Sequence, residues 1–339
     1  MKKNILFIPL LILLLTSFTK VNNSSSYIVM ESTTKTILKS SNKDEQMLIA
    51  STAKILTAMT VIENYDLDEK IYIKEEYTKA IGSSVYLRCG NYFSRRELLH
   101  ALMLRSANDA ACALSDNDSD SFIIKMNELA KKIGMKNSFF TNASGLDEKE
   151  YNMSTAYDLA LLAAYASNNQ IFVEISSKRN YRLITDNNCY VWLNKHKLVN
   201  NNDDFIWGKT GYTKKAHRIL VSNYKHDNMD IIVVTINNNN DWSFHKEAVN
   251  SLDNYIFVTV YNKGIHEIIL DKEYYLLIDN NITIPVLKED ADNIKISLWI
   301  YNNKALLNIY FDNSIIYQNS VKLFDKNNID IDHLIELYM

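Results

Sequence analysis

A serine and a lysine three residues apart could act as a nucleophile and its base. Ser51 and Lys54 precede the largely apolar run 55–62, a pattern typical of a buried helix. One helical turn separates the two side chains, so both lie on one face of that helix. A hydroxyl attacks a carbonyl carbon when a neighbouring amine accepts its proton. The spacing therefore predicts covalent acyl-transfer chemistry at Ser51.

The Ser-x-x-Lys pattern alone has little specificity, because a chain of this length contains about one match by chance. Two further matches lie in a polar region expected to form short strands and a turn: Ser32/Lys35 and Ser40/Lys43. Residues i and i+3 point to opposite faces of a strand, so these pairs should not meet. The alternative for Ser51 and Lys54 is a helix-capping serine with a surface lysine. This alternative is less favoured, because burying an unpaired lysine charge at the start of an apolar helix costs free energy.

A second motif would supply a proton relay and a substrate ligand. Ser106-Ala107-Asn108 lies between two apolar segments, after a helix that a capping box at Ser94 should open. A competing match, Ser115-Asp116-Asn117, begins an acidic stretch expected to form an exposed loop. We therefore favour Ser106 and Asn108.

A third motif, Lys209-Thr210-Gly211, is followed by Tyr212. The lysine offers a fixed charge for a carboxylate, and the threonine offers a hydroxyl. The glycine would let a ligand backbone lie against the strand. The alternative is the end of an edge strand with a turn. The three motifs in this order are far more specific than any one of them.

Composition narrows the function classes. The 339 residues carry a net charge of -3, from 37 basic and 40 acidic side chains that are interspersed, so no basic surface for nucleic acid is expected. The three cysteines form neither a disulfide framework nor a zinc pattern. The seven histidines include no metal-binding motif, so we expect no metal and no cofactor.

The N-terminus has the pattern of a secretory signal. Lys2 and Lys3 precede the apolar run 5–15, which is too short for a comfortable membrane span. We assign residues 1–22 to this signal and expect an extracytoplasmic protein, either secreted or associated with the cell envelope. An uncleaved signal that anchors the chain in the membrane is the alternative. Residues 330–339 are short and acidic, and make a poor anchor.

The order of the expected elements predicts an α+β fold. Strands come first, helices follow, and three strands come next at 207–213, 219–221 and 230–236. A helix around 245–254 closes a domain that we assign to residues 23–262. Among the helices, 122–133 is amphipathic, and Ser154 is expected to cap 155–165. Residues 263–339 contain short alternating runs separated by Asn and Asp, which predict a small β domain.

The sequence resembles the low-molecular-mass penicillin-binding proteins, the serine D-alanyl-D-alanine carboxypeptidases, which are peptidase S11-like. The likeness runs from about Tyr27 to Ile256 and includes the three motifs and the connecting segments 134–140, 145–147 and 154–159. It implies a β-lactamase/transpeptidase-like domain, in which helices flank an antiparallel sheet and form a helical subdomain. Three departures are Ile49, where proline is usual, and Ala107 and His217, where glycine is usual.

The resemblance implies hydrolysis of the terminal D-alanine from peptidoglycan stem peptides through an acyl-enzyme on Ser51. Lys54 would act as the base, its pKa lowered by burial and by Lys209. Ser106 would relay the proton to the leaving D-alanine, and Asn108 would hold the substrate amide. β-Lactam antibiotics would acylate Ser51, and the enzyme would act in the cell wall and affect cell shape.

The resemblance also implies how the rest of the substrate is held. Lys209 and Thr210 would bind the terminal carboxylate. The backbone N–H groups of Ser51 and Tyr212 would stabilise the oxyanion. Two alternatives stay open: a class A-like β-lactamase, for which no Glu-x-x-Leu-Asn motif is found, and a non-catalytic module that binds penicillin or cell wall.

Overall fold

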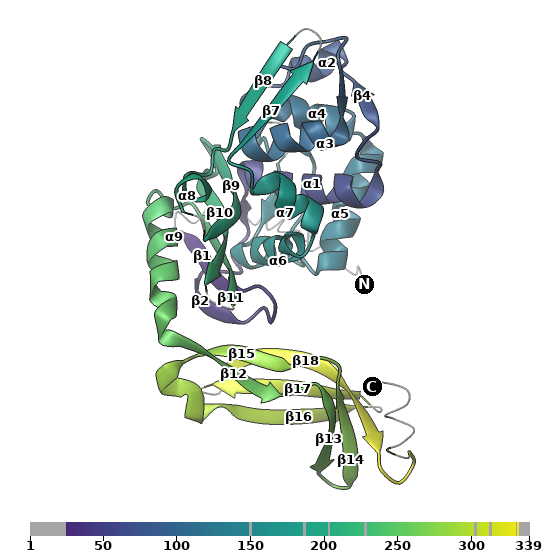
Figure 1. Cartoon of the computed structure of the whole chain (residues 1–339), viewed down its shortest axis with the longest axis vertical. Coiled ribbons are helices and arrows are strands. Elements are labelled where there is room, and N and C mark those ends of the chain that lie inside the picture. The colour runs from purple at the N-terminus through teal and green to yellow at the C-terminus, as the bar shows by residue number, and fades with distance from the viewer. Residues whose placement is uncertain are drawn as a thin grey trace, which may run out of the picture.

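The computed structural model describes residues 25–148, 151–185, 188–202, 204–226, 229–301, 304–311, 314–329 and 331. The expected signal at 1–22 and nearly all of 330–339 lie outside these ranges. Within them the chain forms two bodies, and helix α9 (Asp241–Asn250) leads from the larger one toward the smaller one (Figure 1). No helix of the described ranges has both the length and the apolar character needed to cross a membrane.

The larger body is built on a five-stranded antiparallel sheet in the order β2-β1-β11-β10-β9. Two strands from the start of the chain, β1 and β2, share this sheet with three strands from its middle, and β9 lies at one edge. This arrangement confirms the α+β prediction. The strands are β1 (Ser26–Glu31), β2 (Ile37–Ser41), β9 (Phe205–Thr213), β10 (His217–His226) and β11 (Met229–Ile236).

Helices cover both faces of this sheet. Successive residues of a strand point to opposite faces, and β11 follows this rule. Ile232 and Val234 pack into the large core around α1 and α6, whereas Ile231 and Val233 pack into a smaller core under α9. The central strand is therefore buried on both sides.

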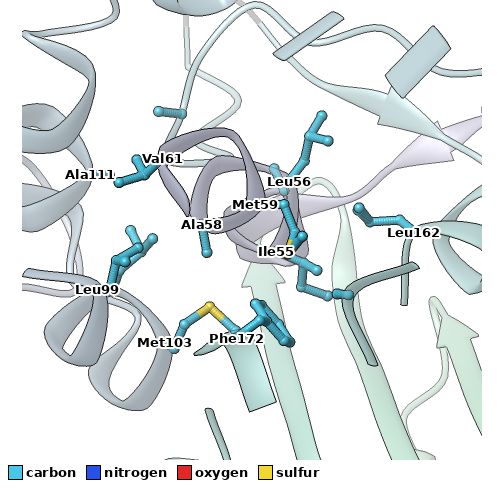
Figure 2. Close-up of a cluster of buried hydrophobic side chains, with 14 of the residues drawn as sticks. Ile55, Leu56, Ala58, Met59, Val61, Leu99, Met103, Ala111, Leu162 and Phe172 are labelled. Carbon is cyan, nitrogen blue, oxygen red and sulfur yellow. The ribbon is translucent and has the colours of Figure 1, made fainter. Parts of the chain in front are cut away.

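Helix α1 (Lys54–Asn64) occupies the centre of the large core. Every residue from Lys54 to Val61 is buried. Side chains from several other helices surround it, among them Leu99, Met103 and Phe172 (Figure 2). The predicted buried helix is thus confirmed, although Ser51 lies just ahead of it in a 3-10 turn over Ala50–Ala53.

Eight further α-helices belong to the described part of the larger body, and the sequence predicted how two of them begin. The predicted capping box is present, because Ser94 and Glu97 each bond to the other's backbone. The N-cap predicted at Ser154 is wrong, because the N-cap of α6 is Thr155, whose Oγ1 accepts from the Asp158 N–H at 3.0 Å. Ser154 belongs to the short strand β6 instead. The helices are α2 (Glu75–Thr78), α3 (Arg95–His100), α4 (Asn108–Ser115), α5 (Asp120–Ile133), α6 (Ala156–Ser167), α7 (Gln170–Ser176), α8 (Lys197–Asn201) and α9 (Asp241–Asn250).

Three two-stranded pairs complete the larger body. The longest is the hairpin β7–β8, which projects at the top in Figure 1. The strands are β3 (Met47–Leu48) with β6 (Met153–Ser154), β4 (Lys70–Tyr72) with β5 (Tyr92–Ser94), and β7 (Asn180–Thr185) with β8 (Asn188–Leu193).

The smaller body consists of strands around a separate apolar core. β12 begins at Tyr255, before the boundary expected at 262, and pairs with β15 inside this body. We therefore propose a domain boundary near Asn254. The strands are β12 (Tyr255–Tyr261) with β15 (Ile282–Leu287), and the sheet β13 (Gly264–Ile269), β14 (Glu273–Ile278), β18 (Ser314–Asp325), β17 (Lys304–Phe311) and β16 (Lys295–Tyr301).

Candidate active site

The fully buried amine of Lys54 has three polar neighbours. Its Nζ lies 3.1 Å from Ser51 Oγ and 2.7 Å from Asn108 Oδ1, and it also contacts the carbonyl oxygen of Ser144. A neutral amine has two N–H groups and one lone pair. The two carbonyl oxygens can accept the two N–H groups, so the lone pair is left to accept the Ser51 O–H. This geometry suits a base that removes the serine proton.

The environment of Lys54 favours its neutral form. Burial lowers the pKa of Lys54 to about 7, and Lys195 acts in the same direction, against the opposing effect of Cys112, Asp118 and Asp109. The neutral amine is therefore abundant near neutral pH, which a general base requires.

The turn that carries Ser51 is tightly packed. Ala50 has φ +44°, a left-handed conformation that is unusual for alanine. Gly145, at φ +81°, lies directly against it, because a Cβ on Gly145 would come within 1.9 Å of the Ala50 carbonyl oxygen. The same segment supplies the Ser144 carbonyl to Lys54. The site thus depends on Gly145, which the family resemblance marked only as the start of a connecting segment.

Ser106 and Lys209, far apart in sequence, meet in the fold. Lys209 Nζ lies 2.9 Å from Ser106 Oγ and 2.7 Å from the carbonyl oxygen of Thr210. Burial, together with Lys54 and Lys195, holds the pKa of Lys209 well below its ordinary value. Ser106 itself has φ +60°, at the end of a π-helical turn. Such strain is typical of functional sites.

Gly211 lets strand β9 approach the Ser51 turn closely. A Cβ on Gly211 would lie 3.2 Å from the Ile49 carbonyl oxygen and 3.3 Å from Thr52 Cγ2. The next residue, Tyr212, is 65% exposed, so it is accessible to a ligand. His217 has φ +58°, so it keeps the backbone conformation that favours the glycine usual at this position.

The competing serine motifs lie apart from this network. Ser32 and Ser40 lie on or beside the β1–β2 hairpin, as expected. Ser115 is buried at the end of α4, not exposed as predicted, because its hydroxyl exchanges hydrogen bonds with Asp118. Asp116 is exposed and accepts from Lys74 and Tyr77.

The sequence reasoning missed two charged residues at the site. The Asp109 carboxylate accepts from the Val85 and Leu87 N–H groups and from Ser84, and so fixes the loop beside Asn108. Lys195 Nζ lies 2.8 Å from Ser83 Oγ. Asp109 directly follows the second motif and could have been suspected. Lys195 follows the hairpin β7–β8 with no motif to mark it.

Comparison with known proteins identifies the family. A family model described as D-alanyl-D-alanine carboxypeptidase, peptidase S11, matches residues 16–240. The chain belongs to this family. The match covers all three motifs and ends before the smaller body, so the C-terminal strands are not part of the family signature.

Individual relatives carry two kinds of name. D-alanyl-D-alanine carboxypeptidase DacF of Bacillus subtilis is 29% identical over 222 residues, which are 63% of this chain and 57% of that protein. A D-alanyl-D-alanine endopeptidase of Haemophilus influenzae is 35% identical over 224 residues, 63% of this chain and 76% of that protein. The chain thus spans less than two thirds of the length of the Bacillus relative.

A solved structure extends the likeness in fold to the smaller body. The D-alanyl-D-alanine carboxypeptidase DacD of Francisella tularensis aligns with a TM-score of 0.71 and 22% identity. The alignment covers 88% of this chain and 92% of that one. The shared fold includes the helix-and-sheet domain and the C-terminal β domain.

Proposed function

We propose that this protein is a penicillin-sensitive serine D-Ala-D-Ala carboxypeptidase of the bacterial cell wall. The observation that carries the proposal is the buried Lys54 amine, which lies 3.1 Å from Ser51 Oγ and whose pKa burial lowers to about 7. Membership of the S11 family supports the same reaction class. The β-lactamase and non-catalytic alternatives have no comparable support.

In the proposed acylation step, Lys54 takes the Ser51 proton as Oγ bonds to the carbonyl carbon between the two terminal D-alanines. The backbone N–H groups of Ser51 and Tyr212 stabilise the oxyanion that forms. The C–N bond then breaks, the proton passes through Ser106 to the leaving amine, and free D-alanine departs. Water hydrolyses the remaining ester and restores Ser51.

Substrate placement follows from the positions of the other side chains. Lys209 and Thr210 bind the terminal carboxylate, and Gly211 lets the peptide lie along β9. A bound carboxylate raises the pKa of Lys209 again, because its negative charge stabilises the protonated ammonium form that burial disfavours. Asn108 uses one N–H on the Ile81 carbonyl at 2.6 Å, so its second N–H can hold the substrate amide.

A labelling experiment tests this proposal. The purified chain, without its first 22 residues, should bind fluorescent penicillin covalently and release D-alanine from a stem pentapeptide. Ser51→Ala should lose both activities. Ser40→Ala, a change within a competing Ser-x-x-Lys match, should keep both. Label retained on the Ser51→Ala variant would refute the assignment of the nucleophile.

Endopeptidase action is a second candidate, because relatives of similar identity carry that name. The two activities differ in the leaving group, which is free D-alanine for a carboxypeptidase and a second peptide for an endopeptidase. A pentapeptide and a cross-linked peptide dimer therefore distinguish them. We expect the release of D-alanine from the pentapeptide to be faster than the cleavage of the cross-linked dimer.

We also propose an extracytoplasmic location, with residues 1–22 acting as a signal. The N-terminal sequence of the exported protein tests this proposal. Cleavage after the apolar run would support secretion, whereas an intact N-terminus in the membrane fraction would support the anchor.

A further inference from the structure

Two histidines outside the catalytic network are buried under α9, and one serine lies between them. His196, Ser222 and His245 are each no more than 1% exposed. Ser222 Oγ lies 3.0 Å from His196 Nε2 and 2.8 Å from His245 Nδ1. His245 Nε2 in turn lies 3.1 Å from Thr235 Oγ1. These contacts form one continuous chain from the start of α8, across β10, to α9 and β11.

The hydrogen bonds of this chain require both imidazole rings to be neutral. Val199 donates its backbone N–H to His196 Nδ1 at 3.3 Å, so the proton of the neutral ring is on Nε2 and is donated to Ser222 Oγ. The Ser222 O–H can then donate to His245 Nδ1, and the His245 Nε2–H to Thr235. Burial lowers the pKa of His196 to about 3 and holds the pKa of His245 well below its ordinary value. The chain is therefore intact at neutral pH.

The chain supports the edge strand β9 from the face opposite the active site. His196 lies directly against Gly208, because a Cβ on Gly208 would lie 2.3 Å from His196 Nε2. Gly208 pairs with Ser222 across β9 and β10. The next residue along β9, Lys209, projects to the other face, where its Nζ lies 2.9 Å from Ser106 Oγ. Because β9 has a neighbouring strand on one side only, the contact beneath Gly208 restrains it further.

His196 also fixes the segment that carries a charge close to the site. Its backbone N–H donates to Asn194 Oδ1 at 2.9 Å, and Lys195 lies between these two residues in the chain. Burial, Lys54 and Lys195 together lower the pKa of Lys209. A displacement of His196 would therefore change both the position of Lys209 and the electrostatic environment of its amine.

We propose that His196 is a positioning residue for recognition of the terminal carboxylate of the substrate. Through the neutral chain to Ser222 and His245, it holds β9 where Lys209 reaches that carboxylate. The proposal rests on the proposed carboxypeptidase function, in which Lys209 binds the carboxylate, and adds a residue that acts from the opposite face of the sheet.

Two synthetic peptides measure carboxylate recognition: Nα,Nε-diacetyl-lysyl-D-Ala-D-Ala and the same peptide with a C-terminal amide. The ratio of their kcat/KM values is the carboxylate preference, in which any loss common to both peptides cancels. Hydrogen bonds to charged groups are strong, so we expect a preference of about tenfold or more in the wild type. His196→Leu should reduce this preference about fivefold. His196→Gln, whose amide N–H can replace the Nε2–H, should keep the preference within about twofold of the wild type.

Two further variants separate positioning from folding. Ser222→Ala removes the central hydroxyl with little change in volume and should also reduce the preference, which provides the test if His196→Leu does not fold. His100→Leu changes another buried histidine, whose ring stacks on Tyr181 with a centroid distance of 3.8 Å. It is the matched control and should keep the preference even where it destabilises the fold.

An unchanged preference in Ser222→Ala or in folded His196→Leu would overturn the positioning role. An equal loss in His100→Leu, or a wild type that shows no carboxylate preference, would overturn it as well. A wild type with neither penicillin labelling nor D-alanine release would refute the proposed function itself, and this role with it.

Discussion

The rate of acylation at Ser51 should depend on pH through the protonation of Lys54. With a pKa of about 7, about 9% of the amine is neutral at pH 6 and about 91% at pH 8. The acylation rate should thus rise about tenfold between these two values. An exposed lysine with the ordinary pKa of 10.5 would be only about 0.03% neutral at pH 7, so burial raises the active fraction roughly a thousandfold.

The assay should separate Lys54 from Lys209. The limiting rate of acylation at saturating fluorescent penicillin, measured by rapid mixing from pH 5.5 to 9, reports the bound enzyme and hence Lys54. The second-order rate constant also contains carboxylate binding by Lys209. Only protonated Lys209 attracts a carboxylate, so this constant should also fall as Lys209 loses its proton, at a pH well below that of an ordinary lysine.

Two results would refute the reasoning about Lys54. The first is a limiting rate that is flat between pH 6 and 8, which would mean that the amine does not titrate there or does not act as the base. The second is a Lys54→Met variant that acylates at the normal rate. A control titration of folding by circular dichroism excludes loss of structure as the cause of a falling rate.

Four further predictions follow from the same contacts. Gly145→Ala should destabilise the fold by about 2–4 kcal/mol in urea and lower acylation more than tenfold, whereas Gly134→Ala, at φ +94° with no neighbour within 4 Å, should cost about 1 kcal/mol and keep acylation. Lys195→Met should move the acid limb of the acylation profile to higher pH, because a cation that lowers the pKa of Lys54 is lost; Lys195→Arg should not. Asp109→Asn should weaken the hydrogen bonds to the loop 84–87 and destabilise the fold by about 2 kcal/mol; it should also move that limb to lower pH. Lys54→Met should stabilise the fold by at most about 5 kcal/mol below pH 7, because the depressed pKa makes the folded state bind the proton less well than the unfolded state does. The gain should shrink as pH rises and vanish above pH 10.5, so a melting temperature that the substitution leaves unchanged at every pH would contradict this prediction.

The local parts of the site could be predicted from the sequence because they depend on short-range geometry. Ser51 and Lys54 face each other whenever their segment is helical, and the apolar run after them requires burial. The capping box at Ser94 was predictable for the same reason. The cap of α6 was not, because Ser154 and Thr155 are chemically equivalent until β6 pairs with β3 and takes Ser154 into a strand.

The sequence by itself determined which groups we propose to react, and the tertiary structure decided the distances between them and the pKa of each lysine. Lys209 Nζ lies 2.9 Å from Ser106 Oγ because β9 forms the edge of the sheet next to the Ser51 turn. Gly211, which has no side chain, allows β9 to approach this turn closely. The low pKa of Lys54 comes from complete burial and from Lys195 on a distant connection. Burial, close packing at Gly145 and the charges facing Lys54 arise from residues far apart in the chain, so no local spacing records them.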